Sequence, residues 1–158
     1  GSPPRLPDNI WLGITAENQQ RADERIPILL QIPAAVRFVS VEPMLGQVDL
    51  TRIGGDWYGN GRINALKGLQ NDDTYVHEYN LRWKAKHCGE LDWVICGSES
   101  GPNHRKTKIE WIRDLREQCI SANVPFFLKQ MEINGRMVKM PELDGKIWAQ
   151  FPEVQYAS

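Results

Sequence analysis

Four short apolar runs constrain the fold of this 158-residue chain more than any other feature of its sequence. They span residues 10–16, 36–41, 92–96 and 125–129, and they are rich in the β-branched and aromatic residues that favour strands. Helical patterns follow the first and the third run. Because apolar strands that alternate with helices are typical of parallel sheets covered by helices, we predict an α/β fold. Four strands fit either a partial (β/α) barrel or a small open parallel sheet flanked by helices.

The first helix is expected directly after Asn18, whose side chain can cap it. One apolar helical face follows, formed by Ala22, Ile26, Leu29 and Leu30. Pro27 lies inside this pattern and predicts a kink or a restart of the helix.

The second helix is expected after residues 107–110, where Thr107 and Glu110 have the spacing of a capping box. Its apolar stripe consists of Ile109, Ile112, Leu115 and Cys119, and Asn123 is placed to end it. Beyond the fourth strand, the spacing predicts a small hairpin over residues 131–139.

Residues 52–90 differ from the rest because turn-forming Gly, Asn and Asp residues interrupt any periodicity. We predict an irregular, variable insertion there, with a short helix at about residues 75–86. Gly1-Ser2 is typical of what remains of a cleaved tag, so a single domain is expected over residues 3–158, as the C-terminal half of a longer natural protein.

Composition excludes several classes of protein. The net charge is −1, so no overall positive field favours nucleic acid or an anionic membrane. No apolar run approaches the roughly 20 residues of a membrane span. The three cysteines are scattered and form no Cys-x-x-Cys pair, which predicts a reduced, cytoplasmic protein without a disulfide framework or a metal centre. We expect a monomer.

Polar residues follow each of the four strands where that strand ends. Parallel strands bring their carboxyl ends to one edge of the sheet, and in α/β folds ligands bind at that edge. Gly97 and Gly101 would let the backbone approach a ligand closely, and a structural salt bridge between Glu42 and Lys129 is the alternative at that pair. The predicted ligand- or cofactor-binding residues are Glu17, Asn18, Glu42, Gly97, Ser98, Glu99, Ser100, Gly101, His104, Arg105, Lys129 and Gln130.

Two other functions remain open from the residues alone. The basic runs at residues 82–87 and 104–108 include aromatic or histidine neighbours, as nucleic-acid-binding segments do. Glu42 and Glu99 could instead be the two carboxylates of a glycosidase-like hydrolase. Cys88, beside His87, is a weaker candidate for a ligand or nucleophile.

Longer motifs carry a family resemblance. The stretch IWLGITAENQQRADERIPILLQIPAAVRFVSVEPMLG is followed, in order, by LDWVICGSESGP, WIRDLREQC and VPFFLKQ. This series resembles the C-terminal part of a phage- and prophage-encoded family of radical S-adenosylmethionine-like proteins of unknown function, over about residues 7–55 and 91–132. The family's usual Gly-Gly-Glu-Ser-Gly loop has Ser98 at its second position here.

The resemblance implies a partial barrel and a longer parent protein whose N-terminal cysteine motif holds a 4Fe–4S cluster. Three thiolates leave one iron free to bind the amino and carboxylate groups of S-adenosylmethionine. This chain has no such motif, so no cofactor is expected on it alone, and its partners would be the N-terminal half of the parent and an unidentified substrate. By resemblance, Glu17, Glu42, Glu99 and Lys129 would line the cavity.

Overall fold

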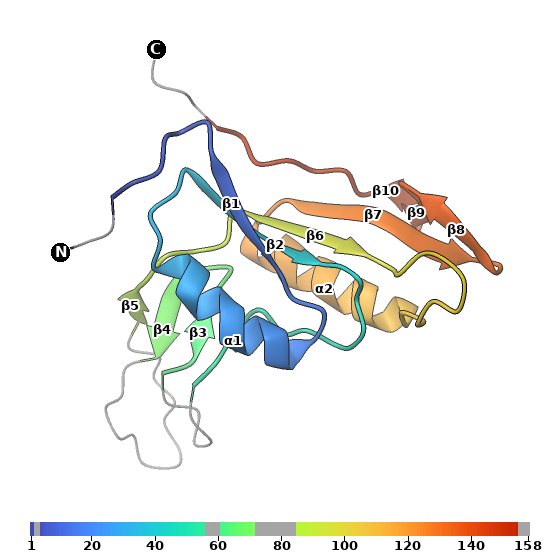
Figure 1. Cartoon of the computed structure of the whole chain (residues 1–158), viewed down its shortest axis with the longest axis horizontal. Coiled ribbons are helices and arrows are strands. Elements are labelled where there is room, and N and C mark those ends of the chain that lie inside the picture. The colour runs from blue at the N-terminus through green and yellow to red at the C-terminus, as the bar shows by residue number, and fades with distance from the viewer. Residues whose placement is uncertain (2–3, 56–60, 72–84, 155–158) are drawn as a thin grey trace.

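The computed structural model describes residues 1, 4–55, 61–71 and 85–154. Its main sheet has five strands in the order β1-β2-β6-β7-β8 (Figure 1). The strands are β1 (Trp11–Thr15), β2 (Val36–Val41), β6 (Trp93–Gly97), β7 (Phe126–Ile133) and β8 (Arg136–Lys139). The first four run parallel, and β8 pairs antiparallel with β7. Within the described residues the sheet is open, with β1 and β8 as its edges, so the α/β prediction is confirmed in its open-sheet form.

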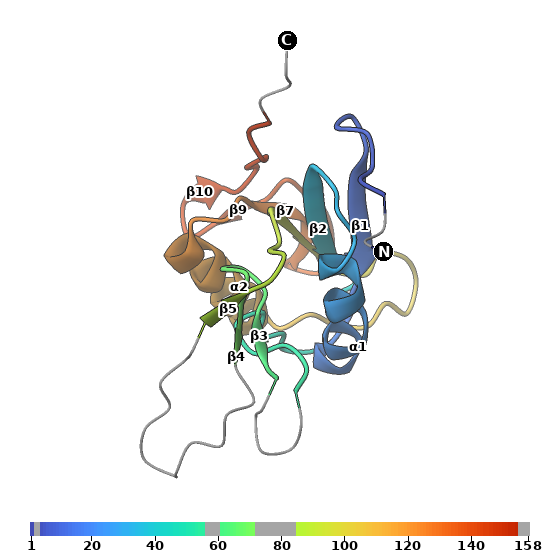
Figure 2. The ribbon, with the colours of Figure 1, turned by 90° about the vertical axis from the view of Figure 1, so that its left-hand side faces the viewer.

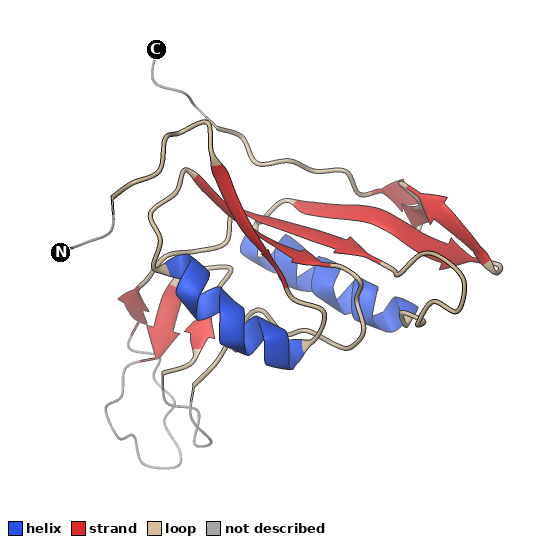
Figure 3. Ribbon diagram, viewed as in Figure 1, coloured by secondary structure: helices blue, strands red, loops and turns tan. Residues whose placement is uncertain are grey.

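Two helices, α1 (Gln19–Leu30) and α2 (Ile109–Ala122), both cover the same face of this sheet (Figures 1 and 2). Their apolar sides meet the buried side chains of the central strands, among them Val39, Val94 and Phe126. Among the described residues, the opposite face carries no helix, as the colouring by secondary structure shows (Figure 3). The main hydrophobic cluster therefore lies on the side of the sheet that the helices cover.

Helix α1 begins as predicted, because the Asn18 side chain accepts a hydrogen bond from the Arg21 amide at 3.0 Å. It continues through Pro27 to Leu30 as one helix, so the predicted restart is wrong. Proline has no N–H to donate to the carbonyl of Asp23. The carboxylate of Asp23 in turn accepts a hydrogen bond from the Gly54 amide at 2.9 Å, which ties this turn to the neighbouring loop.

Helix α2 ends as predicted, at Asn123, which adopts the left-handed conformation with φ 56°. Its predicted capping box is wrong. The cap residue is Lys108, without a side-chain cap bond, and the Thr107 hydroxyl donates to the Met44 carbonyl at 2.8 Å instead. A tertiary contact thus replaces the local one.

The segment predicted as irregular contains a small antiparallel sheet formed by β3 (Ile63–Asn64), β4 (Leu69–Asn71) and β5 (Ala85–His87). Residues 75–84 of the helix expected at 75–86 lie outside the described residues, and its last two positions belong to β5, so the helix is wrong there. The segment also contributes to the core, since Ile53 and Ala65 are fully buried. Single apolar side chains between the turns can be buried in this way, although their spacing follows neither a helical nor a strand period.

The predicted hairpin is present as β7 and β8, which are joined by Asn134-Gly135, both in the left-handed region. The fourth strand is longer than predicted, because its second half pairs with β8 and no longer with β6. Two short strands, β9 (Glu142–Leu143) and β10 (Lys146–Ile147), follow. The chain then returns along the first half of β7, where the Leu128 amide donates to the Trp148 carbonyl at 2.8 Å.

Candidate ligand site at the carboxyl ends of the parallel strands

The loops after the parallel strands meet at one edge of the sheet, as the sequence predicted for their carboxyl ends. The Leu45 amide, after β2, donates to the Glu17 carbonyl after β1 at 2.8 Å. The Met44 amide donates to the Gly97 carbonyl at the end of β6 at 2.9 Å. These backbone bonds fix the loops relative to one another, so the side chains they carry share one surface.

The pair of Glu42 and Lys129 lies at the centre of this edge. Lys129 Nζ donates to Glu42 Oε1 at 3.0 Å, which confirms the expected salt bridge. Gly97 makes room for it, because a Cβ on Gly97 would lie 3.1 Å from Glu42 Cδ. A bulge places one extra residue of β7, Lys129, between the partners of Cys96 and Gly97. Lys129 remains 54% exposed and Glu42 21%, so the pair is open to solvent on one side.

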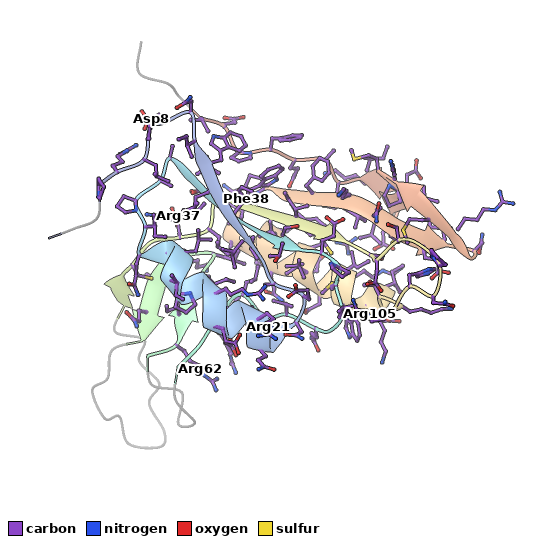
Figure 4. All side chains as sticks on the ribbon, viewed as in Figure 1. Asp8, Arg21, Arg37, Phe38, Arg62 and Arg105 are labelled. Carbon is purple, nitrogen blue, oxygen red and sulfur yellow. The ribbon has the colours of Figure 1, made fainter. Side chains whose placement is uncertain are left out.

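A second pair, Glu99 with Arg105, closes the loop between β6 and α2. Glu99 Oε2 accepts from the Arg105 amide at 2.6 Å and from Arg105 Nε at 3.0 Å, and Oε1 accepts from Nη2 at 2.6 Å. These hydrogen bonds lower the pKa of the Glu99 carboxyl to about 2. Figure 4 labels Arg105 beside the carboxyl ends of the strands.

Glu17 and Asn18 have local partners. Arg25 Nη1 lies 3.3 Å from Glu17 Oε2 and also donates to the Thr15 carbonyl at 2.8 Å. The Asn18 oxygen is used as the cap of α1. Of these two predicted residues, Glu17 forms an ion pair at the shared edge, whereas Asn18 has a structural role as the cap of α1.

Ser98 and Gln130 fasten the start of the same loop to β7. The Ser98 amide donates to the Gln130 carbonyl at 3.0 Å, and Gln130 Nε2 donates back to the Ser98 carbonyl at 2.8 Å. Both residues are buried, at 4% and 7% exposure. Ser100 and Gly101 are exposed, and Gly101 has φ 102°, a conformation that favours glycine.

His104 bridges the tip of this loop to β7. Its Nδ1 lies 2.9 Å from the Gly101 carbonyl and its Nε2 lies 3.3 Å from Glu132 Oε2. The bond to Gly101 and then that to Glu132 raise the pKa of His104 above its ordinary value. Sequence reasoning selected His104 but missed Glu132, because the loop sequence contains no sign of a contact with the hairpin.

The helix-free face of the sheet below this edge is aromatic, which sequence reasoning also missed. Among the described residues, Trp93 contacts four other rings, at centroid distances of 5.9 Å to Trp11, 5.6 Å to Phe38, 6.0 Å to Phe127 and 5.1 Å to Phe151. Figure 4 labels Phe38. The signal was present, since Phe38 and Trp93 are partners in the register and side chains alternate along a strand.

The next layer of this face, closer to the carboxyl ends of the strands, consists of Thr15, Ser40 and Ile95, which are neighbours in the register. Glu42, Gly97 and Lys129 follow at the edge. Phe127 on β7 is the register partner of Ile95, so this face has an aromatic floor, a mixed layer above it and a charged rim.

The geometry argues against the glycosidase-like alternative and shows which side chains of the second basic run already have partners. A glycosidase acid needs a raised pKa, whereas the pKa of Glu99 is lowered and both its oxygens are bonded to Arg105. In the second basic run, Arg105 is engaged by Glu99, and Lys108 Nζ lies 5.4 Å from the centroid of the Trp111 ring. The side chains of the first run, residues 82–87, lie outside the described part of the chain.

The cysteines are poorly suited to chemistry. Burial raises the pKa of Cys119 to about 12 and raises that of Cys96 as well, and both thiols are free. Burial also raises the pKa of Cys88, which is half-buried. Over the described ranges, no group of three or more His, Cys, Asp or Glu side chains could hold a metal ion. No helix in them is long and apolar enough to cross a membrane.

Fold and site together define an open-sheet α/β protein with an ion-paired rim at the carboxyl ends of its parallel strands. A family profile described as a protein of unknown function, DUF5131, matches residues 2–152. The chain belongs to this family. No curated protein and no solved structure matches the chain.

Proposed function

We propose that the rim formed by the carboxyl ends of β1, β2, β6 and β7 binds a small polar ligand, and that this chain is the substrate-side part of a phage-encoded radical S-adenosylmethionine-type enzyme. The observation that carries the proposal is the Glu42–Lys129 pair above Gly97. The pair lies where α/β folds bind ligands, next to a position kept free of a side chain. The family motifs given above supply the class of chemistry.

The pair suits a binding role because it is only partly satisfied. Glu42 Oε1 accepts from Lys129, and among the described residues Glu42 Oε2 accepts no hydrogen bond. A carboxylate oxygen can accept from a hydroxyl or an ammonium group. Lys129, more than half exposed, can turn to an anionic group. The pair can thus serve a ligand that carries both kinds of group.

The described residues do not fit an iron–sulfur cluster. Such a cluster needs several cysteine thiolates that converge on one site, whereas no group of three or more His, Cys, Asp or Glu side chains among the described residues could hold a metal, and Cys96 and Cys119 are fully buried with raised pKa values. We therefore assign the cluster to the N-terminal half of a longer parent protein and derive no step from it. In the proposed complex, Glu42 Oε2 would accept hydrogen bonds from the ribose hydroxyls of S-adenosylmethionine, and that cofactor would supply the radical chemistry when bound.

The two edge strands of the sheet differ in charge, and this difference favours a partner strand at only one of the two edges. The edge strand β8 carries Arg136 and Lys139, and charged edges discourage further pairing. The edge strand β1, with the sequence WLGIT, carries no charge. This difference supports a further strand of the parent protein pairing with β1, which would extend the open sheet toward a barrel.

The experiment uses the full-length parent protein, purified without oxygen and reconstituted with iron and sulfide. Iron content, cleavage of S-adenosylmethionine to 5′-deoxyadenosine and the Kd of S-adenosylmethionine are measured. Glu42→Gln should weaken binding about 10-fold or more, since a hydrogen bond to a charged group contributes about 1.5–3 kcal/mol. The matched control, Glu142→Gln on the exposed strand β9, should bind as the wild type does. A protein without a cluster and without cleavage would refute the enzyme class, and unchanged binding by Glu42→Gln would refute the site.

Nucleic-acid binding is the second candidate, favoured by the exposure of Arg105, Lys106 and Lys108 on one loop. Fluorescence anisotropy with labelled single-stranded DNA and RNA at low salt tests it. Binding should weaken steeply with salt and should fall in the double variant Lys106→Gln/Lys108→Gln. Lys139→Gln, on β8, is the control. Absence of binding at low salt would exclude this function.

A further inference from the structure

Within the described part of the chain, the loop between β6 and α2, residues 98–108, is attached to the rest of the molecule at three places. Its start is fastened by the two hydrogen bonds between Ser98 and Gln130. Its end is fastened by the Thr107 hydroxyl on the Met44 carbonyl. Its middle is fastened to β7 by His104 and Glu132. The first two attachments are neutral and do not depend on pH near neutrality, whereas the third involves an imidazole.

The two partners of His104 determine its protonation state. The Gly101 carbonyl can only accept a hydrogen bond, and so can an ionised Glu132 carboxylate. Both bonds therefore require a proton on each ring nitrogen, which only the imidazolium form has. In a neutral ring one nitrogen has no proton, so one of the two contacts is lost.

We propose that His104 is a pH-sensitive latch: as the imidazolium it fastens the middle of loop 98–108 to β7, and on losing its proton it releases that loop from Glu132 or from its own turn. The loop carries Glu99 and Arg105, so the latch governs how firmly one wall of the rim is held. The turn it closes is otherwise unusual, with Gly101 at φ 102° and Asn103 at φ 56°. Such a turn lacks a regular backbone ladder, and the ring bond to Gly101 stabilises it.

The charged groups around the ring favour the latched form. Glu132, on β7, faces Nε2 and holds the proton. From the loop, Glu99 lies close enough for His104 to lower its pKa, and Lys106 opposes the charge on His104. Arg105 is engaged by Glu99. The pKa of His104 is raised on balance, with the bonds to Gly101 and Glu132 as the largest causes.

The sign of the pH dependence follows from that direction. A group whose pKa is raised on folding stabilises the folded arrangement fully below its ordinary pKa, and that contribution is lost as the pH rises through the raised value. The loop is therefore latched in mildly acidic solution. It is released as the pH rises past the raised pKa of His104.

The test is an NMR titration of this chain from pH 5 to pH 9 without any ligand, so its result is independent of the proposed function. The imidazole signals of His104 report its pKa, and the amide signals of residues 100–106 report the loop. We expect a midpoint above the ordinary value of about 6.5, shared by those amides and absent from them in His104→Gln. Glu132→Gln should lower the midpoint, whereas the control Glu142→Gln should leave it unchanged.

Either of two results would overturn the latch. One is a midpoint at or below the ordinary value, and the other is a midpoint that Glu132→Gln leaves in place. Loop amides that still titrate with the same midpoint in His104→Gln would also overturn it, because another group would then control the loop.

Discussion

The aromatic floor gives a quantitative prediction at Gly13. An ideal Cβ at this position would overlap the Phe38 ring, whose Cε1 atom would lie 2.6 Å away. The ring cannot move without disturbing its contact with Trp93, at a centroid distance of 5.6 Å. Replacing glycine by alanine in a strand otherwise gains about 0.5–1 kcal/mol, whereas forcing a methyl group into a packed site costs about 1–3 kcal/mol. We expect Gly13→Ala to reduce the free energy of unfolding by about 1–2 kcal/mol.

The assay is urea unfolding followed by tryptophan fluorescence, with the free energy taken from the midpoint and the slope. Gly46→Ala is the matched control, because its Cβ would meet only Asn18 Cβ at an ordinary 3.5 Å. In a Phe38→Leu background the same Gly13→Ala change should cost nothing or stabilise. The double-mutant cycle should then give a coupling of about 1 kcal/mol or more.

A wild-type or higher stability of Gly13→Ala would refute this reasoning. So would an equal loss with and without the Phe38 ring, since the cost would then come from the backbone and not from the overlap.

Three further outcomes are expected. Arg105 lowers the pKa of Glu99 to about 2, so this carboxylate stabilises the fold above its ordinary pKa of 4.5. The stabilisation is lost as the pH falls toward 2. The urea midpoint should therefore decrease less steeply with falling pH in Glu99→Gln than in the wild type. A thiol reagent should modify Cys88 first in the native protein and reach the buried Cys96 and Cys119 only on unfolding, as counted by mass spectrometry. Phe126→Ala, at a fully buried position in β7, should cost about 3–5 kcal/mol in the same urea assay.

The sequence was sufficient to predict those features of the fold and site whose controlling interactions are local or follow from parallel strand pairing. Asn18 caps α1 and Asn123 ends α2 because both are properties of the neighbouring backbone. The bond between Glu42 and Lys129 could be anticipated because a carboxylate that follows an apolar strand needs a partner at the same edge. The alternation of strands and helices was enough to place both residues at that edge.

The sequence was insufficient where a distant contact outcompetes a local one. Thr107 has the spacing of a cap, but its hydroxyl binds the Met44 carbonyl, 63 positions away in the chain. Glu132 could not be connected to His104 without knowing that β7 continues into a hairpin beside the loop. The bulge that turns Lys129 toward Glu42 is likewise a property of two paired strands, so neither strand shows it alone.

The ion pairs of the rim differ in how easily a ligand could open them. Glu99 is held by three hydrogen bonds from one arginine, two of them from the guanidinium group, and such a fork is rigid and strong. Glu42 is held by a single contact to a lysine that is 54% exposed, and exposed pairs of this kind contribute about 0–1 kcal/mol. A charged ligand can therefore replace the Glu42–Lys129 contact at small cost while Glu99 and Arg105 keep the loop in shape. The rim thus combines one fixed pair that shapes it with one exchangeable pair that, under the proposed function, would meet the ligand.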